Sequence, residues 1–88
     1  MHIGARSTVW LAMLVIAMSL FSCTDKALKH YNLGVEAAAR DDLDAAIEHW
    51  RASIRYRSDD PEAHYNLGSA LLRKERYEEA ESSFTTAL

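Results

Sequence analysis

The stretch His30–Gly34, HYNLG, decides the fold, because it recurs unchanged as His64–Gly68. The two copies begin at residues 30 and 64, an offset of 34. Five consecutive identities at one offset indicate an internal repeat, and a fixed period of this length is typical of stacked structural units. The fold must therefore be built from two similar units of about 34 residues.

The residues around the repeated stretch predict helices. Leu28, Tyr31 and Val35 recur at helical intervals, and the composition is rich in good helix formers, with three Gly and one Pro in 88 residues. The pair Asp41–Asp42 and the run 58–61, SDDP, are typical of helix ends and starts, since Asp caps a helix and Pro suits its first turn. We expect helices over residues 27–40, 43–56, 61–74 and 77–88, in antiparallel pairs.

The aligned positions resemble the tetratricopeptide repeat (TPR) family. The residues that carry the resemblance are His30, Leu33, Gly34, Ala37, Ala46, Trp50 and Ser53 in the first unit and His64, Leu67, Gly68, Leu71, Ala80, Phe84 and Ala87 in the second. The sequence departs from the family pattern where His30 and His64 replace the usual Trp and where Ser58 replaces a Pro. The resemblance implies an all-α solenoid in the TPR region 24–88, with repeat 1 at about 27–60 and repeat 2 at about 61–88.

The resemblance also implies which residues pack the repeats together: Leu33, Gly34, Ala46, Trp50, Leu67, Gly68, Ala80 and Phe84. A glycine inside a helix costs about 1 kcal/mol relative to alanine. Its recurrence at positions 34 and 68 predicts close helix approach, with Gly34 against Ala46 and Gly68 against Ala80.

The N-terminus reads as a targeting segment. Residues 9–21, VWLAMLVIAMSLF, are uncharged, and a helix of this length spans roughly 20 Å, short of the roughly 30 Å hydrocarbon core of a bilayer. The apolar residues cover every face, which disfavours a core helix in so small a protein. With Arg6 as a positive flank, residues 1–22 are predicted to be a signal peptide.

The four residues that follow, Leu20-Phe21-Ser22-Cys23, resemble the lipobox of bacterial lipoproteins. Leu20, Ser22 and Cys23 match that motif, and Phe21 is larger than usual. The resemblance implies cleavage before Cys23 and lipidation of its thiol. An uncleaved membrane anchor and plain secretion remain as alternatives. Because Thr24 rather than Asp follows the cysteine, the resemblance favours the outer membrane in a Gram-negative cell.

By resemblance, TPR arrays bind partner peptides or proteins in a groove lined by the first helix of each repeat. The groove residues implied here are Tyr31, Asn32, Val35, Tyr65, Asn66, Ser69 and Arg73. These positions also serve ordinary packing and solvation in TPR proteins. A subclass that clamps C-terminal carboxylates uses lysines in the groove; none stands in the expected positions, so that class of receptor is disfavoured.

Other functional classes have little support in the sequence. The net charge of −3 argues against nucleic acid. No nucleophile motif, phosphate-binding loop or zinc motif is present, so we expect neither catalysis nor a cofactor. His30 and His64 occupy equivalent positions one repeat apart, and His49 stands beside Trp50. We therefore interpret these histidines as packing residues, not as metal ligands.

The function predicted from the sequence is a lipid-anchored TPR adaptor in the cell envelope, in pilus or envelope assembly. The alternative is the anchored N-terminal part of a longer regulatory or enzymatic protein whose active domain lies beyond Leu88. A third reading is a cytoplasmic TPR protein with a misplaced start. Repeat arrays usually end in a polar capping helix, whereas this sequence ends at Leu88 inside a helical pattern. We expect a longer protein, self-association through the last helix, or a partner that covers it.

Overall fold

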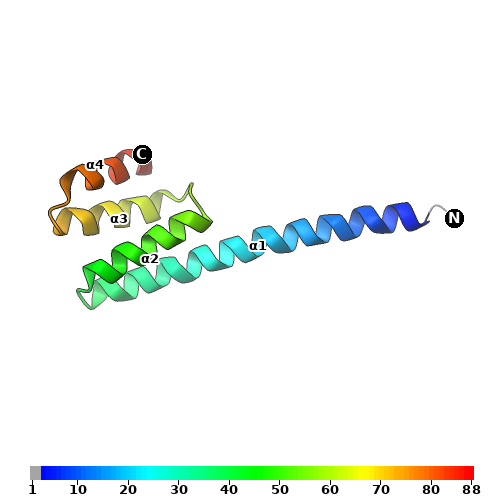
Figure 1. Ribbon diagram of the computed structural model, residues 1–88, viewed down its shortest axis with the longest axis horizontal. Helices are drawn as coiled ribbons and strands as arrows, with labels where there is room; N and C mark the ends of the chain where they lie inside the picture. Colours follow the sequence, from blue (N-terminus) through cyan, green and yellow to red (C-terminus); the bar gives the residue numbers. More distant parts are fainter. Residues whose placement is uncertain (1–2) are drawn as a thin grey trace.

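The computed structural model describes residues 3–88, without the side chains of residues 3–7, 19 and 20. It is all-helical over the described range (Figure 1). The four helices are α1 (Ile3–Ala39), α2 (Leu43–Tyr56), α3 (Pro61–Arg73) and α4 (Tyr77–Ala87). Three of the four agree with the predicted ranges to within one residue, and the predicted all-α repeat fold is confirmed.

The helix ends arise from the residues predicted to make them. The Asp42 carboxylate accepts a hydrogen bond from the amide of Ala45 at 3.2 Å, and that of Asp60 accepts one from Glu62 at 3.1 Å. Such caps satisfy amides that have no partner inside the helix. The turn before each second helix contains a residue with φ of 61°, Asp41 in repeat 1 and Glu75 in repeat 2. The two turns therefore share one backbone conformation, 34 residues apart.

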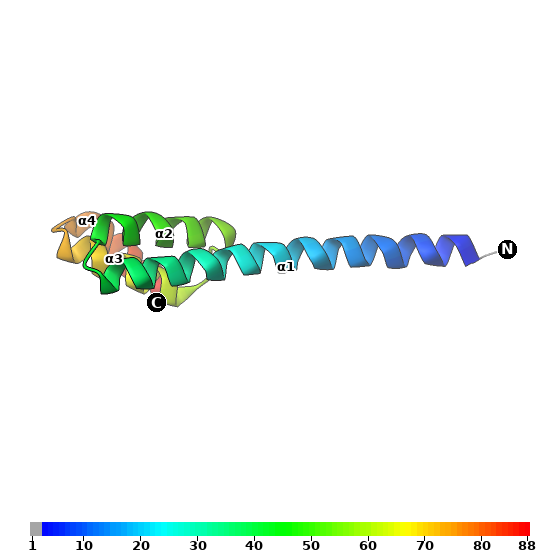
Figure 2. The same ribbon diagram turned by 90° about the horizontal axis from the view of Figure 1, so that it is seen from below.

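The first helix starts much earlier than predicted. It was expected to begin at residue 27, but α1 runs without a break from Ile3 through the apolar segment into repeat 1. The physical reason is that no proline or glycine stands between Val9 and Leu33, so nothing in that range interrupts the helix. Figures 1 and 2 both show this helix projecting far beyond the other three, and the molecule measures 66 × 26 × 13 Å.

The core lies where α1 and α2 pack together, α3 and α4 pack together, and α2 packs on α3. Its buried members are Ala37, Ala46, Ile47, Trp50, Leu67, Ala70, Leu71 and Ala80. Toward the N-terminus, packing begins at Ala27, whose carbonyl accepts a 2.7 Å hydrogen bond from the buried hydroxyl of Ser53. The part of α1 that takes part in the repeats is therefore its C-terminal third.

Candidate functional site

Two of the predicted groove residues meet across the repeats. The Asn66 amide on α3 donates a hydrogen bond to the Tyr31 hydroxyl on α1 at 3.0 Å. That hydroxyl donates to the Glu62 carboxylate at 3.4 Å. Burial raises the pKa of the Tyr31 phenol, and the Glu62 carboxylate raises it further, while the bond from Asn66 lowers it. The phenol therefore stays protonated at neutral pH and can donate while it links α1 to α3.

The other predicted groove residues lie along the same two helices in different settings. Asn32 and Val35 are exposed on α1, and Tyr65 on α3 is 59 % exposed. Ser69 is half-buried. Arg73 makes an ion pair with Asp41 at 2.5 Å, so a nearby carboxylate already compensates its charge. The set thus divides into residues that join the repeats and residues that remain open to solvent.

A hollow lies beside Tyr31, between α1 and the start of α3. Its volume is about 340 Å³, and it is lined by Thr24, Ala27, Leu28, Tyr31, Arg57, Asp60 and Glu62. Leu28 and Glu62 were not among the predicted site residues. Glu62 stands four residues before Asn66, one helical turn away, so helical spacing alone places it on the face that meets Tyr31.

Both glycines make the predicted close approach to the second helix, but each meets an aromatic ring and not the predicted alanine. A Cβ on Gly34 would lie 2.5 Å from the Trp50 indole nitrogen, and one on Gly68 would lie 2.9 Å from the Phe84 ring. The atoms nearest to each glycine therefore belong to an aromatic ring and not to Ala46 or Ala80. The indole N–H of Trp50 also donates to the Tyr31 carbonyl at 3.2 Å, which fixes the ring against α1.

The alanines predicted for packing, Ala46 and Ala80, are both fully buried in the core. Leu67 is buried too, whereas its repeat equivalent Leu33 is half-buried. Phe84 is half-buried and lies against Tyr65, with ring centroids 5.6 Å apart. The predicted packing residues are thus brought to the interior or its edge, with those at the two ends of the array less covered.

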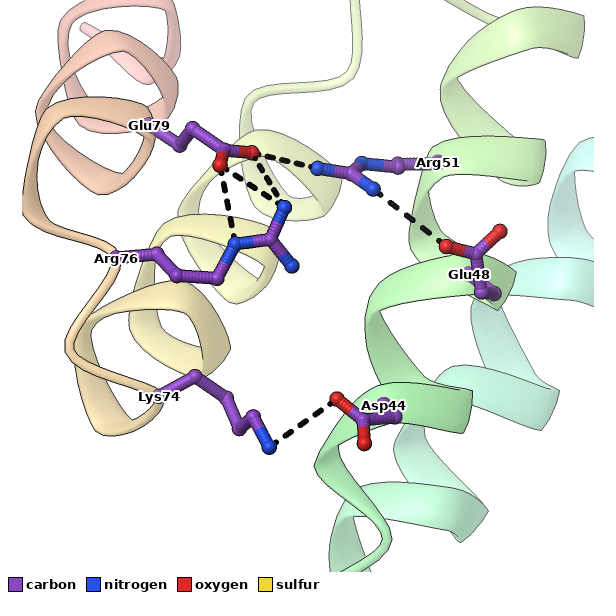
Figure 3. Close-up of polar contacts among 6 residues, drawn as sticks. All are labelled: Asp44, Glu48, Arg51, Lys74, Arg76 and Glu79. Atoms are coloured by element: carbon purple, nitrogen blue, oxygen red, sulfur yellow. Dashed lines mark hydrogen bonds and ion pairs between the residues drawn. The ribbon is translucent and has the colours of Figure 1, made fainter.

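A cluster of charges ties the second helices of the two repeats together (Figure 3). Glu79 of α4 accepts from Arg51 of α2 at 2.7 Å and from Arg76 at 2.9 and 3.0 Å. Lys74 pairs with Asp44 across the same boundary at 3.3 Å. All five side chains are partly exposed, so each pair contributes modestly, on the order of 0.2–1 kcal/mol. Two of these pairs, Arg51–Glu79 and Lys74–Asp44, cross the boundary between repeat 1 and repeat 2.

His30 and His64 are both half-buried and lie apart, and His30 has a neighbour that the sequence analysis did not predict. His30 lies next to His49, with the two Nδ1 atoms 3.4 Å apart, and its ring also lies 5.8 Å from that of Tyr56. Sequence spacing alone does not pair residues 30 and 49, because the contact depends on how α1 and α2 cross. His64 instead directs Nε2 to the Ser58 carbonyl at 2.8 Å. His30 and His64, though equivalent in sequence, therefore have different surroundings.

The apolar segment is exposed where its side chains are described, from Val9 to Met18 and at Phe21. By length and composition, α1 includes one stretch that is long and apolar enough to cross a membrane. Cys23 is an exposed, free thiol. Leu20, the first residue of the predicted lipobox, lies outside the described side chains, and residues 1–2 lie outside the described range.

Antiparallel helix pairs that repeat every 34 residues, each packed on its neighbour, define a helical-repeat protein. A family model described as "Tetratricopeptide repeat" matches residues 31–88. The chain belongs to the tetratricopeptide repeat family. Members of this family in general mediate protein–protein interaction and are non-catalytic. No curated protein and no solved structure matches the chain.

Proposed function

We propose that this chain is a membrane-anchored adaptor of the bacterial cell envelope. In this proposal residues 1–22 are removed as a signal peptide and Cys23 is lipidated. The TPR region 24–88 then binds a segment of a partner protein. By its resemblance in layout to small TPR lipoproteins of type IV pilus biogenesis, we assign the partner to pilus or envelope assembly.

The observation that carries the proposal is the common face of α1 and α3. Both helices pack on α2, and the hydrogen bond between Tyr31 and Asn66 joins them directly, so this face does not require a partner to form. Val35 is 44 % exposed on it, and Tyr65 is more exposed still. A fixed surface with open apolar and aromatic side chains loses little entropy when a ligand binds.

The chemistry of this face favours an extended peptide with apolar side chains. Val35 and Tyr65 offer apolar contact area, and the exposed amide of Asn32 can both donate to and accept from a peptide backbone. The cation at Arg73 is already paired with Asp41. A free C-terminal carboxylate therefore finds no unpaired cluster of cations in the predicted groove set.

The anchor is supported by the position of Cys23. Its thiol is exposed at the end of the apolar segment and one helical turn before Ala27, where packing begins. The packed repeats therefore do not cover the thiol, and a modifying enzyme can reach it. Each buried CH₂ of an attached acyl chain contributes about 0.8 kcal/mol to membrane binding, and two or more chains hold stably.

The test of the anchor is metabolic labelling with palmitate, with Cys23→Ala beside the parent chain. We expect label in the parent alone, together with a shift in mobility from loss of residues 1–22. Label in neither chain would exclude lipidation and leave the segment as an uncleaved anchor or a plain signal.

The test of the binding face is a photoreactive amino acid placed at Val35, in cells of the organism that makes the chain. The matched control carries it at Glu81, an exposed residue of α4 outside the common face. We expect one dominant adduct at position 35 that is absent at position 81 and is lost on Tyr65→Ala. Equal adducts at both positions would refute this face as the binding site.

A further inference from the structure

The described cationic side chains fall into two groups. Those that form an ion pair with a carboxylate are Arg51, Arg57, Arg73, Lys74 and Arg76. Among the residues that the structure describes, those without such a pair are Lys26, Lys29, Arg40 and Arg55, and all four side chains are exposed. An exposed cation without a carboxylate partner remains available to an anion from outside the chain.

The end of α2 lies beside α1 at the point where α1 leaves the packed repeats, as Figures 1 and 2 both show. The ammonium of Lys26 on α1 lies 5.6 Å from the centre of the Tyr56 ring on α2. That ring stacks on His30, with the two centroids 5.8 Å apart, and Tyr56 is still 40 % exposed. The start of repeat 1 and the end of α2 therefore share one surface.

The charged groups around this surface are mainly positive. Burial lowers the pKa of His30, and the charges of His49, Lys29 and Arg55 lower it further. The charged groups that shift this pKa are thus all basic residues. Asp25 lies at the edge of the surface, and the described contacts include no ion pair between it and a lysine. The group that we call the basic patch consists of Lys26, Lys29, Arg55 and Tyr56.

The basic patch lies next to the proposed membrane anchor. Lys26 and Lys29 follow Cys23 by three and six residues of unbroken helix, a rise of about 5 and 9 Å. Each headgroup layer of a bilayer is about 5–8 Å thick, and long lysine side chains extend the reach of their charge. The patch therefore lies within reach of the headgroups, whether a lipid on Cys23 or the apolar segment holds the chain.

The basic patch and the proposed binding face lie on opposite sides of α1. Val35 follows Lys26 by nine residues, which is two and a half turns at about 3.6 residues per turn. The two side chains therefore leave the helix in opposite directions. A ligand on the basic patch leaves Val35 and the common face of α1 and α3 uncovered.

We propose that the basic patch binds the headgroups of anionic membrane lipids. Each Lys or Arg this close to an anionic surface strengthens binding about fivefold. The Tyr56 ring suits the same layer, because amphipathic aromatic rings are enriched at the membrane interface. The inference rests on the proposed membrane anchor, which brings the patch to the lipid, but it requires neither cleavage nor lipidation at Cys23. This second attachment holds the repeats in one orientation, with Val35 turned away from the bound headgroups.

Photo-cross-linking of the full chain in vesicles tests the proposal. A photoreactive phenylalanine replaces Tyr56 and, in a matched chain, replaces Tyr65, which is also exposed but lies on the common face of α1 and α3. One set of vesicles is phosphatidylcholine, and the other is equal parts phosphatidylcholine and phosphatidylglycerol. Mass spectrometry measures the lipid adducts. We expect adducts at position 56 to be several times more abundant in the anionic vesicles, and adducts at position 65 to be few in both.

Removal of single charges separates the basic patch from the net charge of the chain. With the probe at position 56, Lys29→Gln should lower the adduct yield in anionic vesicles by about fivefold. Arg40→Gln is the matched control, because Arg40 is also an exposed, unpaired cation of α1. It lies about 26 Å along the helix from Cys23, well beyond the Debye length of about 10 Å, so the yield should not change.

Flotation of the vesicles separates a failure of this proposal from a failure of the anchor. Chains that float with both kinds of vesicle but give equal adducts at positions 56 and 65, or equal adducts with neutral and anionic lipid, would overturn the proposal and leave the anchor in place. The patch would then be open to an acidic segment of a protein. Chains that float with neither would refute the anchor and this inference with it. Equal losses from Lys29→Gln and Arg40→Gln would also overturn the proposal, since net charge alone would explain them.

Discussion

The two repeats carry the same pattern, yet their equivalent residues are buried to different extents. Trp50 is 5 % exposed, whereas its equivalent Phe84 is half-buried. Leu43 packs against the core, whereas its equivalent Tyr77 is 61 % exposed. The difference follows from position, since α3 and α4 cover one face of repeat 1. Burial in this fold is therefore set by the neighbour that a repeat has, as expected for arrays stabilised by contacts between adjacent units.

The largest effect should come from truncating the aromatic residues. Trp50→Ala removes a buried ring that packs on Gly34 and donates to the Tyr31 carbonyl, so we expect a loss of about 3–5 kcal/mol in the free energy of unfolding. Phe84→Ala should cost well under half as much because its ring is partly solvated. Urea unfolding of the full chain in detergent, followed by circular dichroism, measures both. Equal losses would contradict the view that the neighbour sets the burial.

The next largest difference between the two repeats should come from adding a Cβ at each glycine. Gly34→Ala meets the fixed indole at 2.5 Å, and overpacking of this kind costs about 1–3 kcal/mol. At Gly68 the Phe84 ring can move toward solvent, and the gain in helix propensity of about 1 kcal/mol offsets most of the strain. We expect Gly34→Ala to lower the unfolding midpoint clearly and Gly68→Ala to change it little. If Gly68→Ala instead lowers the midpoint more than Gly34→Ala, the Trp50 ring moves aside more easily than the Phe84 ring.

A smaller effect is expected from the charges between the repeats. Arg51→Ala removes the contact from α2 to Glu79 at 2.7 Å, and an exposed pair of this kind contributes about 0.2–1 kcal/mol. The loss should shrink in high salt, because screening weakens the pair in the parent chain. Arg55→Ala, an exposed arginine of the same helix, is the control. A loss unaffected by salt would point to packing by the arginine stem instead.

The smallest effect concerns the pH dependence of stability. It involves His49 of repeat 1, whose equivalent in repeat 2 is Ser83. Burial lowers the pKa of His30, and the nearby charges of His49, Lys29 and Arg55 lower it further. Because the folded state then holds this proton less tightly than the unfolded state, stability is present above about pH 6.5 and declines as the pH falls below it. Unfolding midpoints at pH 7.5 and 5.5 should show this decline.

His49→Ser tests the origin of that decline. The substitution removes one cause and leaves burial, so the slope should become shallower without vanishing. A steeper slope would mean that His49 stabilises the protonated form of His30.

The sequence predicted what depends on local pattern and on the repeat. The bounds of α2 follow from Asp42 and from apolar spacing, and the equivalence of the repeats follows from the 34-residue offset. The early start of α1 was missed because its apolar residues cover all faces and leave no stripe to mark where packing begins. The contact of His30 with His49 was missed because it depends on how two helices cross.

For the candidate site, too, the residues could be predicted from the sequence but their contacts could not. Family resemblance placed Tyr31 and Asn66 on one face, but it did not predict the hydrogen bond between them, which requires the packing of both α1 and α3 on α2. The difference between Tyr31 and Tyr65 was also invisible in the sequence. Both have the same neighbours along the chain, and only the three-dimensional arrangement shows that one is half-buried and the other exposed.

The unbroken course of α1 has a mechanical consequence. From Cys23 to Tyr31 the chain rises about 1.5 Å per residue as helix, or about 12 Å in all, with no flexible tether between them. If Cys23 is held at a bilayer, this rigid link keeps Tyr31 within about that distance of the lipid headgroups. The binding face can then reach partners only within about one domain width of the anchor. Partners would be met by diffusion in the plane of the membrane, and a soluble partner would have to descend to within a nanometre or so of that plane.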